Sequence, residues 1–124
     1  MSTIITKPIK SSSSGGTTST PPRKLFVVGS SQYQVVDSVK IVDYVSAKWM
    51  VSIKNLTDNT TMMMDVSATH NDIQPYYSQS NILGQPMPLH IQVLIMGGTH
   101  MVLQITNNTT SSVEIRVQST LLAV

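Results

Sequence analysis

Apolar and polar residues alternate with a period of two in several short runs between Leu25 and the end of the chain. Successive side chains of a β-strand point to opposite faces of a sheet, so this alternation predicts strands with one buried face. The residues predicted to face a core are Ala47, Trp49, Val51, Ile53, Met62, Met64, Val66, Ala68, Met87, Leu89, Ile91, Val93, Ile95, Met101, Leu103, Ile105, Val113, Ile115 and Val117.

Turn-forming residues separate these runs. Gly97 and Gly98 join two alternating runs and predict a tight hairpin, because glycine adopts positive φ without strain. Residues 57–61 and 107–112 are predicted turns, and residues 71–86 are predicted to form a loop. No helical period extends beyond about a turn. Seven or eight short strands therefore predict an all-β fold, an antiparallel β-sandwich over residues 25–124.

Residues 1–24 form a separate compositional unit, rich in Ser, Thr, Gly and Pro and too poor in large apolar side chains to fold alone. We expect an extended arm, which is either a disordered tail or a segment that becomes ordered on a neighbouring subunit. Fully extended, it would reach about 80 Å, enough to cross such a subunit. Its basic residues Lys7, Lys10, Arg23 and Lys24 have no acidic neighbour and are candidate interface residues.

Charge and hydropathy narrow the choice of partners. The net charge is +2, and residues 25–124 hold four basic and six acidic side chains, with no basic stripe interleaved with aromatics. We therefore expect no direct contact with nucleic acid. The start of the chain lacks the apolar core of a secretory signal, and no apolar run approaches the about 20 residues that cross a bilayer. We expect a soluble protein that does not contact a membrane.

The residues that usually perform catalysis are sparse and scattered. The chain has no cysteine, which excludes disulfides, thiolate metal sites and a cysteine nucleophile. The predicted hairpin should bring His90 and His100 near one another, but their spacing with His70 matches no common metal-ligand set. The acidic residues occur singly, and neither a Gly-x-Ser-x-Gly elbow nor a glycine-rich phosphate loop is present. We expect no enzymatic activity, no metal, no cofactor and no small-molecule substrate.

Asn55, Asn59, Asn107 and Asn108 each match the N-x-[ST] pattern of glycosylation sites. Asn and Thr are also the residues that turns require, and we interpret these four matches as turn chemistry. The abundance of Ser, Thr and Asn, together with the low charge, favours surfaces that pair with neighbouring molecules.

Met62, Met63 and Met64 do not form a soft-metal site, because adjacent strand residues point to opposite sides of a sheet. Met62 and Met64 share the parity of the core, where methionine is an adaptable filler. Met63 lies on the other face, so its apolar side chain indicates contact with another subunit or with the arm. Tyr76 and Tyr77 are the aromatic residues available to stack on a ligand, since Trp49 has core parity.

The segments "SAKWMVSIKN" and "DVSATHND" resemble a β-sandwich module of tailed-bacteriophage virion structural proteins. That module has an Ala-Lys-aromatic strand, a polar Thr/Asn turn, and a strand ending in His-Asp/Asn. It continues with a Tyr-containing loop, a Leu-Gly and a C-terminal hairpin, to which Tyr76-Tyr77, Leu83-Gly84, "VLQITNN" and "VEIRVQSTLLAV" correspond in order. The resemblance covers residues 45–124. It implies a structural role in a virion and no catalytic residue.

Together these observations predict an oligomeric adaptor or connector in the tail, neck or baseplate of a tailed phage, made in the host cytoplasm and assembled into the virion. Its partners would be other virion structural proteins and copies of itself, since symmetric assemblies use one surface patch repeatedly. A capsid decoration or head-fibre protein, and a glycan- or receptor-binding sandwich module, are the alternatives. The predicted interface residues are Lys7, Lys10, Arg23, Lys24, Met63, Tyr76 and Tyr77.

Overall fold

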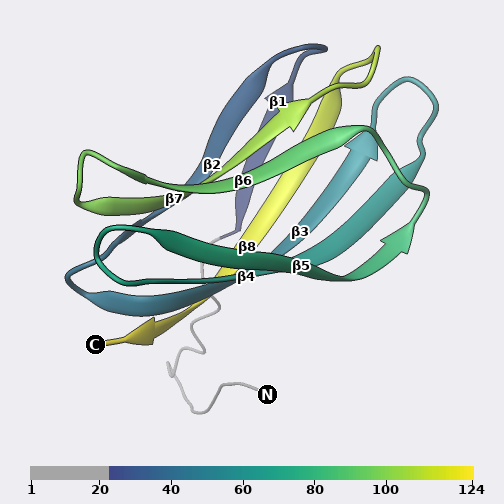
Figure 1. Cartoon of the computed structure of the whole chain (residues 1–124). Coiled ribbons are helices and arrows are strands. Elements are labelled where there is room, and N and C mark those ends of the chain that lie inside the picture. Colours follow the sequence, from purple (N-terminus) through teal and green to yellow (C-terminus); the bar gives the residue numbers. More distant parts are fainter. Residues whose placement is uncertain (1–22) are drawn as a thin grey trace, which may run out of the picture.

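A computed structural model describes residues 23–124, which form eight antiparallel strands in two sheets (Figure 1). The strands are β1 (Lys24–Val28), β2 (Tyr33–Lys40), β3 (Tyr44–Asn55), β4 (Thr61–His70), β5 (Pro75–Gly84), β6 (Leu89–Met96), β7 (His100–Asn107) and β8 (Val113–Ala123). One sheet has five strands in the order β1-β8-β3-β4-β5, and the other has three in the order β2-β7-β6. The predicted all-β, antiparallel two-sheet class is confirmed.

The expected arm, including Lys7 and Lys10, falls almost entirely outside the described residues. The described part begins at Arg23, and β1 begins at Lys24, the last residue assigned to the arm from sequence. β1 forms one edge of the five-stranded sheet and β5 forms the other. Arg23, the first described residue, therefore lies beside β1 at the edge opposite β5.

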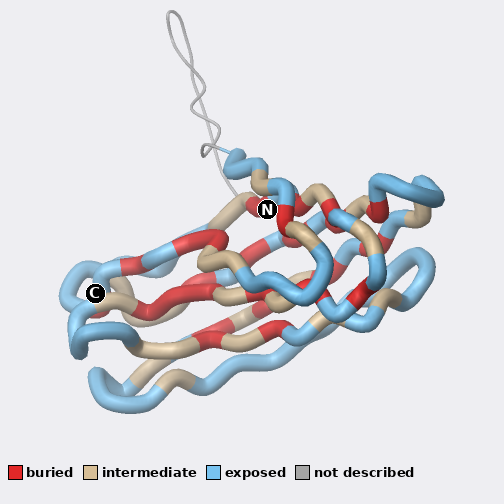
Figure 2. Tube along the Cα trace, turned by 90° about the horizontal axis from the view of Figure 1, so that it is seen from above, coloured by how far each residue is buried: buried red, intermediate tan, exposed pale blue. Residues whose placement is uncertain are grey.

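The core lies between the two sheets, where the alternation placed it (Figure 2). Trp49, Val51 and Ile53 of β3 are fully buried, and so are Ile115 of β8 and Leu103 and Ile105 of β7. Met62 and Met64 are buried while Met63 is exposed, as the parity of the methionine run predicts. The register pairs Trp49 with Val66 and Val51 with Met64, so the buried positions of neighbouring strands coincide.

The hairpin at Gly97 and Gly98 is confirmed. Both glycines have positive φ, 63° and 69°, and the Thr99 N–H donates to the Met96 carbonyl at 3.2 Å. The hairpin does not bring His90 and His100 together, which corrects the expectation from sequence. His100 pairs with Met96 at the turn, whereas His90 pairs with Thr106 near the far end of the same ladder.

The predicted loop at residues 71–86 is wrong, because Pro75–Gly84 forms strand β5 and pairs with β4. β5 is an edge strand, and nine of its ten residues are exposed. A strand with neither face buried needs no apolar alternation, so the pattern that identifies the other strands is missing here.

A buried polar contact joins the two sheets. The Trp49 indole N–H, on β3, donates to Asp37 Oδ2 at 2.8 Å, and Asp37 lies on β2 in the other sheet. The register of β2 shifts between Val35 and Asp37, and this bulge leaves both Val36 and Asp37 buried. The Lys24 ammonium, on β1, contacts Asp37 Oδ1 at 2.6 Å. One carboxylate therefore connects three strands of the two sheets.

Replacing Asp37 with alanine should lower the free energy of unfolding by about 2–3 kcal/mol, because the fully buried indole N–H of Trp49 would lose its acceptor. Urea denaturation followed by fluorescence of Trp49, the sole tryptophan, measures this change. Asp43→Ala removes the same charge from an exposed turn and should change stability by less than about 0.5 kcal/mol. Equal effects of the two substitutions would contradict a structural role of the Asp37–Trp49 contact.

Candidate functional site

The outer face of the five-stranded sheet is the side that points away from the three-stranded sheet. Strand register arranges its side chains in rows that run from β8 across β3 and β4 to β5. The first row contains Leu122, Ser46, Thr69 and Tyr76, and the second contains Thr120, Lys48, Ser67 and Ser78. Hydroxyl groups therefore dominate one end of this face.

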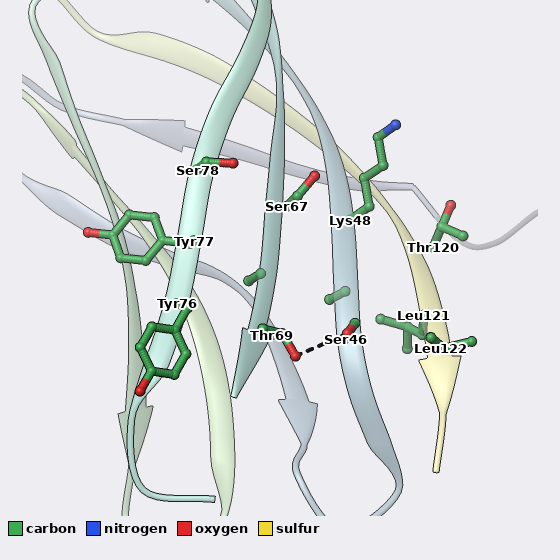
Figure 3. Close-up of a pocket in the computed structure, with 12 residues that line it drawn as sticks. Ser46, Lys48, Ser67, Thr69, Tyr76, Tyr77, Ser78, Thr120, Leu121 and Leu122 are labelled. Carbon is green, nitrogen blue, oxygen red and sulfur yellow. Dashed lines mark hydrogen bonds between the residues drawn. The ribbon is translucent and has the colours of Figure 1, made fainter. Parts of the chain in front are cut away.

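These two rows line a shallow depression of about 670 Å³, which we call the hydroxyl trough (Figure 3). The row between them, which contains Ala47, Ala68, Tyr77 and Leu121, lines it too. Small side chains form its floor, where Ser46 Oγ donates to Thr69 Oγ1 at 3.2 Å. Tyr76 on β5 and Leu122 on β8 stand at opposite ends of the first row, and both are more than half exposed. The trough thus combines hydroxyl donors and acceptors with an exposed aromatic ring, in a shape open to solvent.

Large apolar side chains gather beyond the trough on the same face. Met63 of β4 lies opposite Leu83 of β5, and Met50 of β3 is a diagonal neighbour of Met63 across the β3–β4 ladder. Their exposed fractions are 36% for Met63, 46% for Met50 and 60% for Leu83. We call these three residues the apolar patch. No element within residues 23–124 covers it, and clustered exposed apolar surface is typical of a contact with another molecule.

Charged groups on this face largely pair with one another. Lys48 Nζ lies 3.8 Å from Asp65 Oδ2, which also accepts a hydrogen bond of 2.8 Å from the Asn81 amide. The Arg116 guanidinium lies 2.7 Å from the Glu114 carboxylate. These contacts are exposed and contribute little stability, but they leave the face close to neutral. Such a surface does not select a strongly charged partner.

The structure does not bring the predicted interface residues together, and it does not describe Lys7 and Lys10. Met63 and Tyr76 share the outer face, while Tyr77 is paired with the buried position Ala68 and leaves β5 on its other face. Arg23 and Lys24 lie at the β1 edge, and Lys24 makes the intramolecular contact with Asp37. The interface role of these residues stays a prediction. Trp49 has no exposed surface, which confirms its assignment to the core.

Two buried polar residues organise the fold; from the sequence, Asn107 was identified only as a turn residue and Asp37 was not singled out. Asp37 has a signal there, since it stands inside an apolar run and a buried tryptophan requires an acceptor. The sequence signal of Asn107 is weaker, because it is only the first residue of a predicted turn. Its amide donates to the Val28 carbonyl at 3.0 Å and to the Ser111 carbonyl at 2.7 Å, and its Oδ1 accepts from the Thr109 N–H at 2.9 Å.

Asn107 is fully buried, so its side chain closes the β7–β8 turn and attaches it to the end of β1. Asn55 is also buried, and its Oδ1 accepts from the Thr57 N–H at 2.9 Å. At these two positions the interpretation as turn chemistry is confirmed, because the side chains are occupied inside the fold. In the adjacent turn, the hydroxyl of Thr60 donates to Asp58 at 2.6 Å and lowers the pKa of that carboxyl below its ordinary value.

Within residues 23–124, no three His, Asp or Glu side chains lie close enough together to hold a metal ion. The same part of the chain has no helix with the length and hydropathy needed to span a bilayer. His70 is held by β3 and by its own loop, with Nε2 lying 2.8 Å from the Tyr44 carbonyl of β3 and Nδ1 accepting from the Asp72 N–H at 3.0 Å. Its contacts are therefore structural.

Comparison with known proteins found a likeness in fold to a solved structure. No protein-family model and no curated protein matches the chain. Among solved structures, the tailspike protein of Acinetobacter phage vB_ApiP_P1 matches with a TM-score of 0.49 and 13% sequence identity. The match covers 95% of this chain and 25% of the tailspike chain, so this protein spans about a quarter of that length. At these values the likeness carries no argument about function.

Asn107→Ala should lower the free energy of unfolding by about 2–4 kcal/mol, because it leaves two carbonyls and one N–H unpartnered in the buried turn. Chemical denaturation measures the loss. The neighbouring Asn108 is exposed, and Asn108→Ala is the matched control, with an expected change below about 0.5 kcal/mol. A stable Asn107→Ala variant would show that the turn closes without this side chain.

Proposed function

We propose that this protein is a structural component of a tailed-phage virion, an oligomeric adaptor or connector of the tail, neck or baseplate. The resemblance of "SAKWMVSIKN" and "DVSATHND" to virion β-sandwich modules supports the choice of particle. The observation that carries a docking role is the outer face of the five-stranded sheet, where Met50, Met63 and Leu83 are exposed beside paired charges. We propose a binding role rather than a catalytic one.

Two surfaces would share the docking in this proposal. The apolar patch provides an area whose burial against a neighbouring subunit is favourable, at about 25 cal/mol per Å² of apolar surface removed from water. Residues 1–22 provide an arm that leaves at the β1 edge and adds to a neighbour through main-chain pairing, with Lys7 and Lys10 improving register. Partners are other virion proteins and further copies of this chain, with no role for nucleic acid or membrane.

A second candidate function is recognition of a surface glycan, which the hydroxyl trough favours. Its exposed lining is mostly apolar, includes hydroxyl-bearing residues of β3, β4 and β5, and has Tyr76 at its rim (Figure 3). Neutral sugars are bound by such hydrogen-bonding groups together with an aromatic face. Glycan-array binding that disappears in Tyr76→Ala but persists in Tyr33→Ala, an exposed tyrosine on the other sheet, would select this function over the first.

Deleting residues 1–22 should leave a folded domain, because the buried core lies entirely between Val28 and Val117. We expect a cooperative unfolding transition close to that of the full chain and loss of incorporation into particles. Complementation of a phage lacking the protein, followed by quantification of the protein in purified virions, measures incorporation. Normal stoichiometry of the truncated protein would overturn the proposed role of the arm.

Met63→Lys should weaken association with neighbouring virion proteins by about tenfold or more, since a charge would be desolvated in the contact. The free energy of unfolding should change by less than about 1 kcal/mol, because Met63 is already exposed. Met96→Lys is the matched control, with an exposed methionine on the other sheet. Co-sedimentation with the assembled particle measures both variants, and equal losses would argue against the apolar patch as the docking surface.

A further inference from the structure

β5 is the longest of the four edge strands, and with the eight-residue β6 it is one of the two that carry no charged residue. None of its ten residues carries a charge, and Pro75, its single proline, is the first residue. β1 has five residues and begins at Lys24, and β2 contains Asp37, Lys40 and a bulge. Proteins block pairing at a sheet edge with short strands, charged side chains, proline and bulges. Residues 76–80 of β5 contain none of these.

We propose that the β5 edge pairs antiparallel with β5 of a second copy of this chain, joining two five-stranded sheets into one continuous sheet across a two-fold axis. The proposal rests on the oligomeric part of the proposed function and names the surface that makes the first contact. It does not depend on residues 1–22, because β5 and β1, where the described chain begins, are opposite edges of the sheet.

The geometry of β5 limits where the two copies meet. Asp65 of β4 pairs with Ser80 and Met63 pairs with Leu83, so Asn81 and Ile82 form a bulge, with φ of 53° at Asn81. A bulge bends a strand and interrupts its ladder, which leaves residues 75–80 as the regular part of the edge. The pairing is therefore confined to these six residues on each copy.

Symmetry then fixes the register to two choices. Residues directly opposite in an antiparallel pair lie on the same face, so two identical strands related by a two-fold axis pair residues of the same parity. The axis must therefore pass through a residue, and the centre of the regular edge offers Tyr77 or Ser78. In these registers Tyr76 lies opposite Ser78 or Ser80, respectively.

The choice of a second copy as the partner follows from charge. Like charges placed directly opposite destabilise a strand pair, so two copies of a strand pair poorly in any register that brings like charges opposite each other. In both registers every opposing pair of residues 75–80 is neutral, so self-association meets no such penalty. A strand evolved for a charged partner would carry complementary charge, and β5 carries none.

Ser78→Lys tests the proposal directly, because Ser78 lies on the axis or one residue from it in both registers, and the two lysines would repel. Sedimentation velocity of the full chain from about 1 to 300 µM should show a concentration-dependent dimer for the wild type. The variant should weaken association at least about tenfold. Ser38→Lys places the same change at an exposed serine of β2 and should leave the dimer intact.

Two further variants locate the contact. Gln92→Lys reports on β6, the other uncharged edge strand, and should have no effect on the dimer. The chain lacking residues 1–22 should dimerise as the full chain does, so loss of its incorporation into virions would leave the β5 contact standing. Hydrogen exchange of the dimer should show added protection confined to residues 75–80.

Three results would overturn the proposal. These are a wild-type chain that remains monomeric over the whole concentration range, an oligomer that survives Ser78→Lys unchanged, and an oligomer that is broken by Gln92→Lys instead. Circular dichroism and the urea transition of Ser78→Lys confirm that the variant is folded, since Ser78 is exposed and its replacement should change stability by less than about 1 kcal/mol.

Discussion

The contact between the Trp49 indole and the Asp37 carboxylate determines how the two sheets of this sandwich meet. Trp49 occupies the middle strand of the five-stranded sheet and has no exposed surface, so its N–H needs an acceptor from the opposite layer. The bulge in β2 turns Asp37 inward to provide it, and Lys24 contacts the second carboxylate oxygen. A displacement of one sheet against the other would leave a buried donor and a buried anion without partners, which makes other alignments costly.

In this alignment the inner faces of the two sheets pack against each other. Other molecules can therefore bind only at the outer faces, the loops and the sheet edges. Polar side chains of the turns, such as that of Asn107, lie inside the fold. There their hydrogen-bonding groups are paired with the protein's own backbone. Surfaces that retain exposed apolar area include the outer face around Met63 and the β5 edge. A protein with little charge and two such surfaces is suited to permanent contacts more than to transient ones.

The sequence predicts the parts of this fold that depend on one-sided burial. β3, β4, β7 and β8 each lie in the interior of a sheet, and their core positions follow from parity, although Val102 of β7 is buried on the other face as well. β5 was not predicted from the sequence, because both of its faces are exposed and it has no apolar alternation. Its pairing with β4 depends on the register of the β4–β5 hairpin. His90 and His100 show the complementary limit, since sequence indicates a hairpin but not how far along its ladder each residue lies.

The sequence predicts which residues face away from the core on the outer face, but it does not predict which of them are neighbours. The parity of Met63 places it outside the core, yet its neighbours Met50 and Leu83 come from strands whose register no local pattern specifies. The position of Tyr76 also depends on register. It lies both at the rim of the hydroxyl trough and on the free edge strand β5. Pairing of two β5 strands would bring two troughs next to each other across the joint. A ligand or subunit bound in one trough would then contact the other copy, so occupation of the face and pairing of the edge would be energetically coupled.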